Sequence, residues 1–437
     1  MGGGGPVIDI DNYLTIVALE DGLTAALSGN TVEYCVDGDG NWKTLSSNTA
    51  SESINKGHML SFRGNLTPAS NKGVGKFTIS KSCDLTGNCN SLLFGDDAVD
   101  NLDLTGKDYA FYQLFYNCST IKNVSSNFLP ATTLANDCYS HMFYYCSELT
   151  TAPQLPATKL QSSCYYYMFS GCRKLTTVPQ LPATTLAYSC YAGMFRYCNS
   201  LTSAPQLPAT TLGTYCYNSM FEYCTSLTTA PALPATTLVS MCYNSMFRNC
   251  SSLTTAPALP ATTLSSSCYG YMFLGCSSLT TAPQLPATKL QSSCYYYMFS
   301  GCRKLTTAPA LPARTLATEC YQGMFQGCTS LTTAPELSAT TLAGHCCYSM
   351  FDGCTSLTTA PTLPATTLAS NCYTYMFRNC SKLNYIKAMF TTTPSTTYTN
   401  NWVSGVSSSG TFVKNKNATW NVTGTYGIPS GWTVQTA

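Results

Sequence analysis

The chain has 437 residues and a formal net charge of +2, and only 10% of its residues are Asp, Glu, Lys or Arg. An average soluble protein has about 25%, and proteins that bind nucleic acids or anionic membranes carry a basic patch. The sequence has no evident patch of this kind, and no stretch approaches the roughly 20 apolar residues of a membrane span. We therefore expect neither a nucleic-acid partner nor membrane insertion. The abundant Ser, Thr, Asn and Tyr side chains suit an uncharged polar ligand such as a glycan, although they also suit an ordinary solvated surface.

Residues 1–8 form a Gly-rich lead that we expect to be flexible. The start of the chain has neither the basic nor the apolar region of a secretory signal. We expect an extracellular protein, associated with a virion or a cell surface. Without such a signal, the protein would leave the cell by another route, lose a leader, or leave inside an assembled particle.

Alternating polar and apolar segments, separated by Gly, Asn and Asp, predict a small antiparallel β-sandwich over residues 9–107. The pairs Asp37-Gly38 and Asp39-Gly40 lie between apolar runs and predict a hairpin. Of all the cysteines, Cys83 and Cys89 in this region are the best candidates for a disulfide.

Ten copies of one phrase, Cys-Tyr-x-x-Met-Phe-x-x-Cys-x-x-Leu-x-x-Ala-Pro-x-Leu-Pro-Ala-x-x-Leu, fill the chain between Cys138 and Cys380 with a strict period of 26 residues. A degenerate copy over residues 110–134 precedes them. Repeats of this length cannot bury their apolar face alone and stack on their neighbours. The sequence thus predicts an α/β solenoid of about 11 coils over residues 108–388.

Successive residues of a helix lie about 100° apart around its axis. If one repeat is drawn in this way, its apolar side chains fall on one half of the helix and most of its variable side chains fall on the other. The inner set is Leu160, Cys164, Tyr165, Met168, Phe169 and Cys172, and the outer set is Ser162, Ser163, Tyr166, Tyr167 and Ser170. We therefore predict a short amphipathic helix in every coil. The following Leu-Thr-Thr predicts a short strand, because the proline after it limits parallel pairing to about three residues.

Twenty of the 25 cysteines belong to the repeats. On helices, the two cysteines of a repeat would lie about 12 Å apart, and equivalent cysteines of neighbouring coils roughly 8 to 10 Å apart, which is too far for a disulfide. We expect free, buried thiols, and consider a disulfide framework or a metal site as alternatives. The spacing typical of zinc sites is absent, so we predict no metal and no cofactor.

After Leu383 the repeated pattern becomes irregular, and the sequence of residues 389–437 predicts a β-structured cap. Three of the four tryptophans, Trp402, Trp420 and Trp432, lie in this segment. Large aromatic side chains here suit a lid over the last coil, whose apolar surface and strand edge would otherwise be exposed.

The repeated phrase resembles the BspA-like leucine-rich repeats of bacterial surface proteins, which carry a similar Ala-Phe-x-x-Cys-x-x-Leu core. The resemblance covers about residues 108–388, although each unit here is a few residues longer and has Met in place of Ala before Phe. The closing segment also resembles the termini of such proteins from gut anaerobes and their bacteriophages. The resemblance implies adhesion or receptor recognition.

The residues that change from repeat to repeat are candidates for ligand contact, because recognition surfaces are rich in Tyr, Ser, Asn, Gly and Arg. Drift on an unconstrained outer face would give the same picture. The candidate ligand-binding residues are Tyr144, Tyr145, Tyr166, Tyr167, Tyr197, Tyr223, Arg248, Tyr271, Tyr296, Tyr297 and Arg378.

The three histidines are scattered, nucleophile motifs are absent and the repeats carry few carboxylates, so we expect no enzyme. The first hypothesis is a bacteriophage tail-fibre or virion receptor-binding protein that recognises a host cell-surface glycan or protein. In this hypothesis the N-terminal domain serves for virion attachment or homo-oligomer formation. The alternatives are a bacterial cell-surface adhesin and, third, an enzyme acting on glycans.

Overall fold

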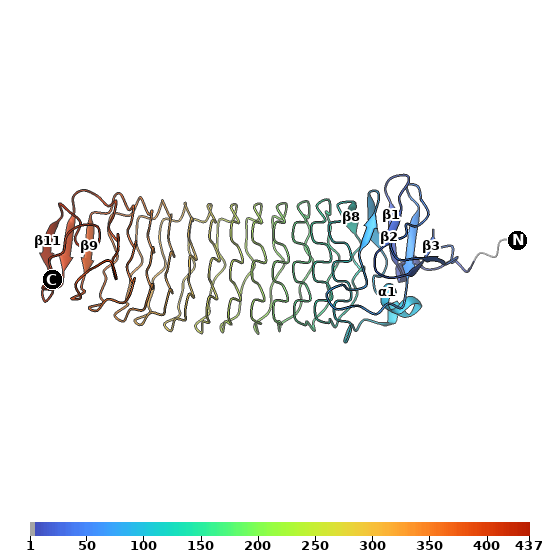
Figure 1. Ribbon diagram of the computed structural model, residues 1–437, viewed down its shortest axis with the longest axis horizontal. Helices are drawn as coiled ribbons and strands as arrows, with labels where there is room; N and C mark the ends of the chain where they lie inside the picture. The colour runs from blue at the N-terminus through green and yellow to red at the C-terminus, as the bar shows by residue number, and fades with distance from the viewer. Residues whose placement is uncertain (1–4) are drawn as a thin grey trace. The chain divides into compact units, whose positions relative to one another are not determined.

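The structure, a computed structural model, describes residues 5–437 and falls into two compact units, divided after Ala209. Unit 1 begins with β-sheets and continues into repeat coils; unit 2 consists of repeat coils followed by a small sheet (Figure 1). The elements of unit 1 are η1 Ile10–Asn12, β1 Leu14–Ala18, β2 Ala25–Leu27, β3 Val32–Val36, β4 Lys43–Leu45, β5 Met59–Arg63, β6 Phe77–Ile79, β7 Cys83–Thr86, α1 Ser91–Phe94, η2 Gly95–Asp100 and β8 Ile121–Val124. Those of unit 2 are β9 Tyr385–Ala388, β10 Thr411–Lys414 and β11 Thr433–Thr436.

The N-terminal part of unit 1 contains two sheets. One has six strands in the order β4-β3-β5-β1-β7-β8, and the other pairs β2 with β6. They pack through Phe62 and Phe77, whose ring centroids lie 5.1 Å apart. The predicted hairpin is confirmed, because β3 and β4 pair antiparallel across the turn that contains Asp37 and Gly38. The last strand, β8, comes from the first repeat coil and pairs parallel with β7, so the sheet crosses the expected domain boundary at residue 107.

Two features of this part differ from the sequence-based expectation. The first four residues of the expected flexible lead lie outside the described residues, but the Ile8 N–H donates to the Gly38 carbonyl at 2.9 Å, which ties the end of the lead to the hairpin turn. Cys83 and Cys89 are both free and buried. Cys83 is the first residue of β7, whereas Cys89 follows the end of this strand at Thr86. Separate backbone hydrogen bonds hold them, from the Cys83 N–H to Thr120 and from the Cys89 N–H to Phe128.

The predicted helix in every coil is wrong: among the described residues, the segment from the first to the second cysteine of each repeat is a run of turns. Alternate N–H groups close turns onto the carbonyl three residues back, as from Met142 to Tyr139 at 3.2 Å. The N–H groups between them donate to the next coil, as from Tyr139 to Cys164 at 3.0 Å. An α-helix would direct all these N–H groups to carbonyls four residues back in the same segment.

Every fourth residue of this turn ribbon has a left-handed backbone. In one repeat these are Ser163 (φ 53°), Tyr167 (φ 52°) and Gly171 (φ 79°). A positive φ at the third position of a turn reverses the chain direction locally, as in a type II turn. The repeat therefore follows a period of four residues, with two side chains inward and two outward, and its apolar pattern fits this period as well as it fits a helix.

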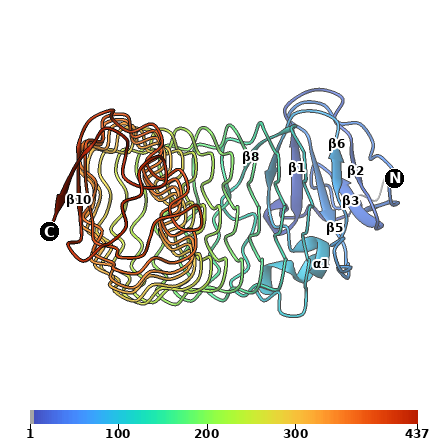
Figure 2. The same ribbon diagram turned by 60° about the vertical axis from the view of Figure 1, so that its left-hand side comes forward.

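The predicted Leu-Thr-Thr strand is shortened to isolated parallel bridges. In unit 2, Thr229 pairs with Thr255, and Thr255 pairs with Thr281. A second set of bridges lies after the Pro-Ala corner, for example between Thr237 and Thr263. Proline lacks an N–H, so the ladder cannot extend past it. Within each unit, successive coils lie side by side (Figures 1 and 2).

The core of each unit consists of side chains stacked in columns. In unit 1 the rings of Phe77, Phe115, Phe143, Phe169 and Phe195 follow one another at 5.5 to 5.7 Å. Strand β6 thus supplies the first ring of the column. In unit 2 a phenylalanine column runs from Phe221 to Phe377 at 5.6 to 5.7 Å, beside a tyrosine column from Tyr217 to Tyr321 at 5.7 to 5.9 Å.

The expectation of free, buried thiols is confirmed, because every cysteine is free and buried. The helix-based separation of 8 to 10 Å is wrong, since hydrogen-bonded coils lie only about 4.8 Å apart. The second cysteine of a repeat has a specific partner instead. The Cys172 thiol donates to the Phe143 carbonyl at 3.2 Å, and the Cys276 thiol donates to the Phe247 carbonyl at 3.1 Å.

The C-terminal part of unit 2 continues the repeat ladder beyond the expected boundary at residue 388. The Phe377 N–H donates to the Trp402 carbonyl at 2.8 Å, and the Asn379 N–H donates to Ser404 at 2.8 Å. The buried Trp402 ring lies against Tyr373 at 6.1 Å and Phe377 at 6.0 Å, where a further repeat would place its own aromatic residues. Strands β9, β10 and β11 form a parallel sheet.

We predict that the thiols are unreactive until the chain unfolds. Burial raises the pKa of the Cys276 thiol to about 12, which disfavours the reactive thiolate. Titration with a thiol reagent should label essentially none of the 25 cysteines of the reduced native protein and all 25 in denaturant. Rapid labelling of many cysteines in the native state would contradict the buried columns.

Candidate functional site

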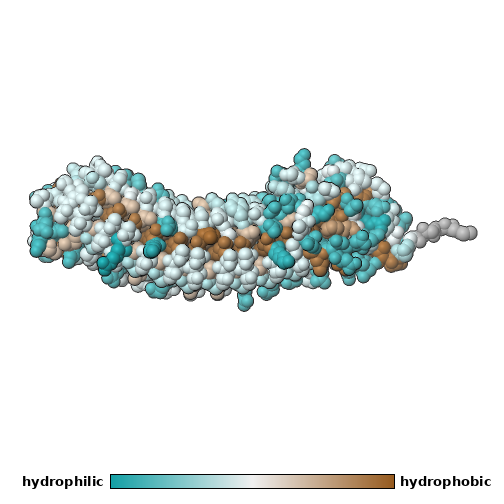
Figure 3. Space-filling view, turned by 90° about the horizontal axis from the view of Figure 1, so that it is seen from below, coloured by the Kyte–Doolittle hydropathy of each residue, from teal (hydrophilic) through white to brown (hydrophobic). Residues whose placement is uncertain are grey.

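All eleven candidate residues lie on the outward side of the turn ribbon, and each is half-buried. They occupy two pairs of columns, one pair after Cys-Tyr and one pair after Met-Phe. On the face shown in Figure 3, residues of intermediate hydropathy cover most of the repeats and a band of hydrophobic residues runs along their middle, while hydrophilic residues gather over the N-terminal part. Strongly hydrophilic residues are therefore sparse over the middle of the repeats on this face.

In unit 1 four of the candidates join one aromatic group, which we call the His141 cluster: Tyr112, His141, Tyr144, Tyr145, Tyr166 and Tyr167. The His141 ring stacks on Tyr167 at 5.6 Å and an angle of 9°, and it meets Tyr166 edge-on at 5.4 Å. Tyr144 lies 5.2 Å from His141 and 4.6 Å from Tyr145. Side chains from three neighbouring coils thus form one contiguous aromatic surface.

Burial sets the charge of this cluster. It lowers the pKa of His141 to about 4, so the imidazole is neutral at neutral pH. Burial, and then the nearby Asp108 carboxylate, raise the pKa of Asp137 to about 6. Asp137 occupies the left-handed position four residues before His141 (φ 52°), and its N–H donates to the carbonyl of Ser162 in the next coil.

Three glycines allow tyrosine rings to lie flat on the following coil. A Cβ on Gly193 would lie 2.6 Å from the Tyr167 ring, and one on Gly171 would lie 2.9 Å from the Tyr145 ring. In unit 2, a Cβ on Gly323 would lie 2.3 Å from the Tyr297 ring. All three glycines have positive φ, so both the backbone and the ring favour glycine there.

In unit 2 five of the six candidates belong to two groups. The Tyr271 cluster contains Arg248, Tyr271, Tyr296 and Tyr297. Tyr271 stacks on Tyr297 at 5.8 Å and meets Tyr296 edge-on at 5.2 Å. The Arg248 guanidinium lies 5.5 Å from the Tyr271 ring and 3.8 Å from the buried Glu222 carboxylate.

The second group, the Tyr375 cluster, contains Tyr348, Asp352, Tyr375 and Arg378. Two guanidinium nitrogens of Arg378 donate to one oxygen of Asp352, at 2.6 and 3.1 Å, and the Asp352 side chain is only 6% exposed. The same guanidinium lies 4.1 Å from the Tyr375 ring. Hydrogen bonding to Asp352 raises the pKa of Arg378, so its charge is both fixed and compensated.

Two candidates lie outside these clusters. The Arg196 guanidinium lies 4.7 Å from the Tyr197 ring. The N–H of Tyr223 donates to the Arg248 carbonyl at 2.8 Å.

Sequence reasoning missed His141, Asp352 and Tyr375. The signal for the ion pairs was present, because Glu222 and Arg248, and likewise Asp352 and Arg378, are 26 residues apart and therefore lie side by side on neighbouring coils.

Among residues 5–437, no group of three or more His, Cys, Asp or Glu side chains is placed to hold a metal ion. Within the same residues, the search for a helix with the length and apolar character of a membrane span found none.

Comparison with models of protein families identifies the family of these repeats. The family described as BspA type leucine rich repeat region (6 copies) matches residues 108–228, 136–280, 244–384 and 297–407. The chain belongs to this BspA-type leucine-rich repeat family. The family is consistent with surface adhesion and recognition. Comparison with curated proteins and with solved structures found no match.

We predict that Asp137 makes the BspA-type repeats less stable at neutral pH than at acid pH. Its pKa is raised from 3.8 to about 6 in the folded protein, so ionisation removes stability as the pH rises through this interval. Asp137→Asn, which keeps a residue tolerant of positive φ, should raise the unfolding midpoint at pH 7 and leave it unchanged at pH 3. Equal midpoints of variant and wild type at pH 7 would show that the folded carboxyl is not perturbed.

Proposed function

We propose that the chain is a non-enzymatic recognition protein whose repeats present the His141, Tyr271 and Tyr375 clusters to a glycan or protein on a cell surface. The observation that carries this proposal is the presence of half-buried tyrosines that are fixed by their neighbours and still reach the surface. Rings held in this way lose little conformational entropy on binding, and tyrosine offers a large contact area.

The charges of the clusters favour an uncharged ligand. Arg378 is compensated by Asp352, Arg248 lies beside Glu222, and the imidazole of His141 is neutral. A ligand would therefore meet mainly aromatic faces and hydroxyl groups, with the Asp137 carboxylate, which is ionised above its pKa of about 6, beside the His141 cluster. Aromatic faces pack against the apolar side of a sugar ring, and tyrosine hydroxyls both donate and accept hydrogen bonds.

We further propose an extracellular setting, with the recognition surface on a bacteriophage tail fibre or virion and the N-terminal sheets serving attachment or self-association. The resemblance of the closing segment to proteins of gut bacteriophages supports this setting. A bacterial cell-surface adhesin is the second candidate, supported by the family itself. The neighbouring genes distinguish them: virion structural genes support the first, and surface-export genes support the second.

The duplication within the array gives a matched test of the proposed surface. Residues 149–177 and 279–307 are identical in sequence. Two tyrosine pairs therefore lie in the same local sequence but have different neighbouring repeats: Tyr166 with Tyr167, and Tyr296 with Tyr297. Changing either pair to Ser should weaken attachment of the purified protein to host cells, by about tenfold if two rings contribute about 0.7 kcal/mol each. Cell binding by fluorescence measures the effect.

The matched control is Thr306→Ser with Thr307→Ser, two exposed residues outside the clusters in the second of these phrases. It should bind like wild type, and circular dichroism should show that all variants remain folded. Full attachment by both Tyr variants, or weaker attachment by the Thr variant alone, would move the ligand to another face. Release of sugar from host polysaccharide by the wild-type protein would contradict the non-enzymatic proposal.

A further inference from the structure

A polar notch lies in the N-terminal sheets of unit 1, away from the repeat clusters. It is a cavity of about 390 Å³ formed by β3, β4, the end of β5 and the start of η2. We call it the Arg63 notch, and the residues that matter for its chemistry are Thr31, Glu33, Thr44, Arg63, Asn65 and Asp96. Its volume falls within the range of about 300 to 1,000 Å³ that is typical of small-molecule sites.

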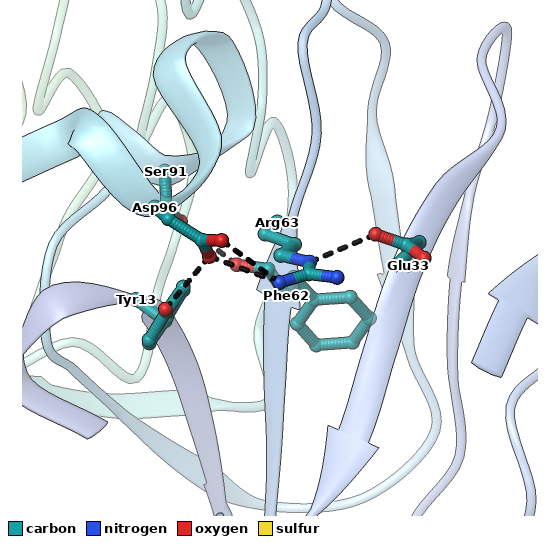
Figure 4. A network of polar contacts seen from close by, with 6 residues as sticks. All are labelled: Tyr13, Glu33, Phe62, Arg63, Ser91 and Asp96. Atoms are coloured by element: carbon teal, nitrogen blue, oxygen red, sulfur yellow. Dashed lines mark hydrogen bonds and ion pairs between the residues drawn. The ribbon is translucent and has the colours of Figure 1, made fainter. Parts of the chain in front are cut away.

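The guanidinium of Arg63 is fixed on three sides. Its Nε donates to Glu33 at 2.8 Å, and its Nη1 donates to the two oxygens of Asp96 at 2.9 and 3.1 Å. Its Cζ lies 4.2 Å from the centroid of the Trp42 ring, and the Tyr13 hydroxyl donates to Asp96 at 2.8 Å. Figure 4 shows Arg63 lying between the two carboxylates. The group is therefore placed before any ligand arrives.

Several polar groups of the notch remain available. Within residues 5–437, the Nη2 of Arg63 and the Oε1 of Glu33 have no hydrogen-bond partner. Thr31, Thr44 and Asn65 are exposed on the same cavity. A donor beside an acceptor suits a hydroxyl group, which can accept from the guanidinium and donate to the carboxylate at the same time.

The charge of the notch excludes one class of ligand. Hydrogen bonds from Tyr13 and Arg63 lower the pKa of Asp96, so this carboxylate is ionised at neutral pH. The carboxylates of Glu33 and Asp96 then face a single guanidinium. The resulting excess of negative charge repels an anion. We propose that the Arg63 notch binds an uncharged saccharide through its hydroxyl groups. This site is separate from the repeat clusters and goes beyond the recognition function proposed for them.

The network around Arg63 also joins β3, β5 and η2, so changes to Arg63 itself would mix binding with stability. Asn65 and Thr44 avoid this problem, because both are exposed and neither belongs to the network. The test variant is therefore the full chain with Thr44→Val and Asn65→Ala. Thr78→Val is the matched control, because Thr78 is the exposed residue of β6 and does not line the notch.

Methyl glucoside, methyl galactoside, methyl mannoside and N-acetylglucosamine serve as probes, with glucuronic acid as the charged counterpart. Saturation-transfer NMR and calorimetry on the full chain should detect at least one neutral sugar, bound at least about ten times more tightly than glucuronic acid. The test variant should bind that sugar about tenfold more weakly with an unchanged unfolding midpoint. The control and the Tyr166→Ser, Tyr167→Ser variant should bind like wild type.

Three results would overturn the proposal: no binding of any of the four neutral sugars, tighter binding of glucuronic acid, or equal binding by the test variant and the Thr78→Val control. Loss of sugar binding in the Tyr166→Ser, Tyr167→Ser variant alone would place the sugar on the repeats instead. That outcome would support the recognition function while rejecting the notch, so the two proposals fail separately.

Discussion

The structure of the repeats depends on hydrogen bonds between coils at every second residue of the turn ribbon. An isolated ribbon would leave half of its N–H groups without a partner, and unpaired buried backbone groups are strongly unfavourable. The next coil supplies the carbonyls, as where the His141 N–H donates to Tyr166 at 2.8 Å. The left-handed residues make this possible, because they turn alternate N–H groups away from the coil's own carbonyls. Each non-glycine residue in that conformation costs roughly 1 to 2 kcal/mol, and the bonds between coils offset this cost.

The same constraint explains the columns of identical side chains. Hydrogen-bonded coils about 4.8 Å apart bring equivalent residues into contact, so residues 26 positions apart in sequence become neighbours. Inside, this produces the aromatic stacks and the row of thiols that donate to phenylalanine carbonyls. Outside, it produces the ion pairs between Asp352 and Arg378 and between Lys174 and Glu148. A ligand surface on such an array consists of equivalent side chains from successive repeats. A change in a single repeat therefore alters only the part of the surface that this repeat contributes.

Much of this arrangement could be predicted from the sequence, and the errors have one origin. The period of 26 residues predicted the stacking, and the spacing correctly placed Cys164, Tyr165, Met168, Phe169 and Cys172 inside. Ser170, which we expected on the outer face, is also buried, and Leu160, which we expected inside, is only half-buried. The helix was wrong because periods of 3.6 and 4 residues cannot be distinguished over nine positions. The left-handed positions also lack a clear signature, since Tyr, Ser, Met and Glu occur there as well as Gly. The predicted tyrosine pairs join into clusters, but His141 was missed because three of its four ring partners, Tyr112, Tyr166 and Tyr167, lie on neighbouring coils.

The most direct test of the ladder uses two adjacent serines, Ser266 and Ser267. Ser267 has a left-handed backbone with φ 52°, and Ser266 does not. The free energy of unfolding of Ser266→Gly and of Ser267→Gly, measured by denaturant titration, should therefore differ in sign or size. The turn ribbon predicts that Ser266→Gly destabilises by about 0.5 to 1 kcal/mol and that Ser267→Gly is neutral or stabilising. Equal destabilisation by both, as a helix would give, would contradict the account.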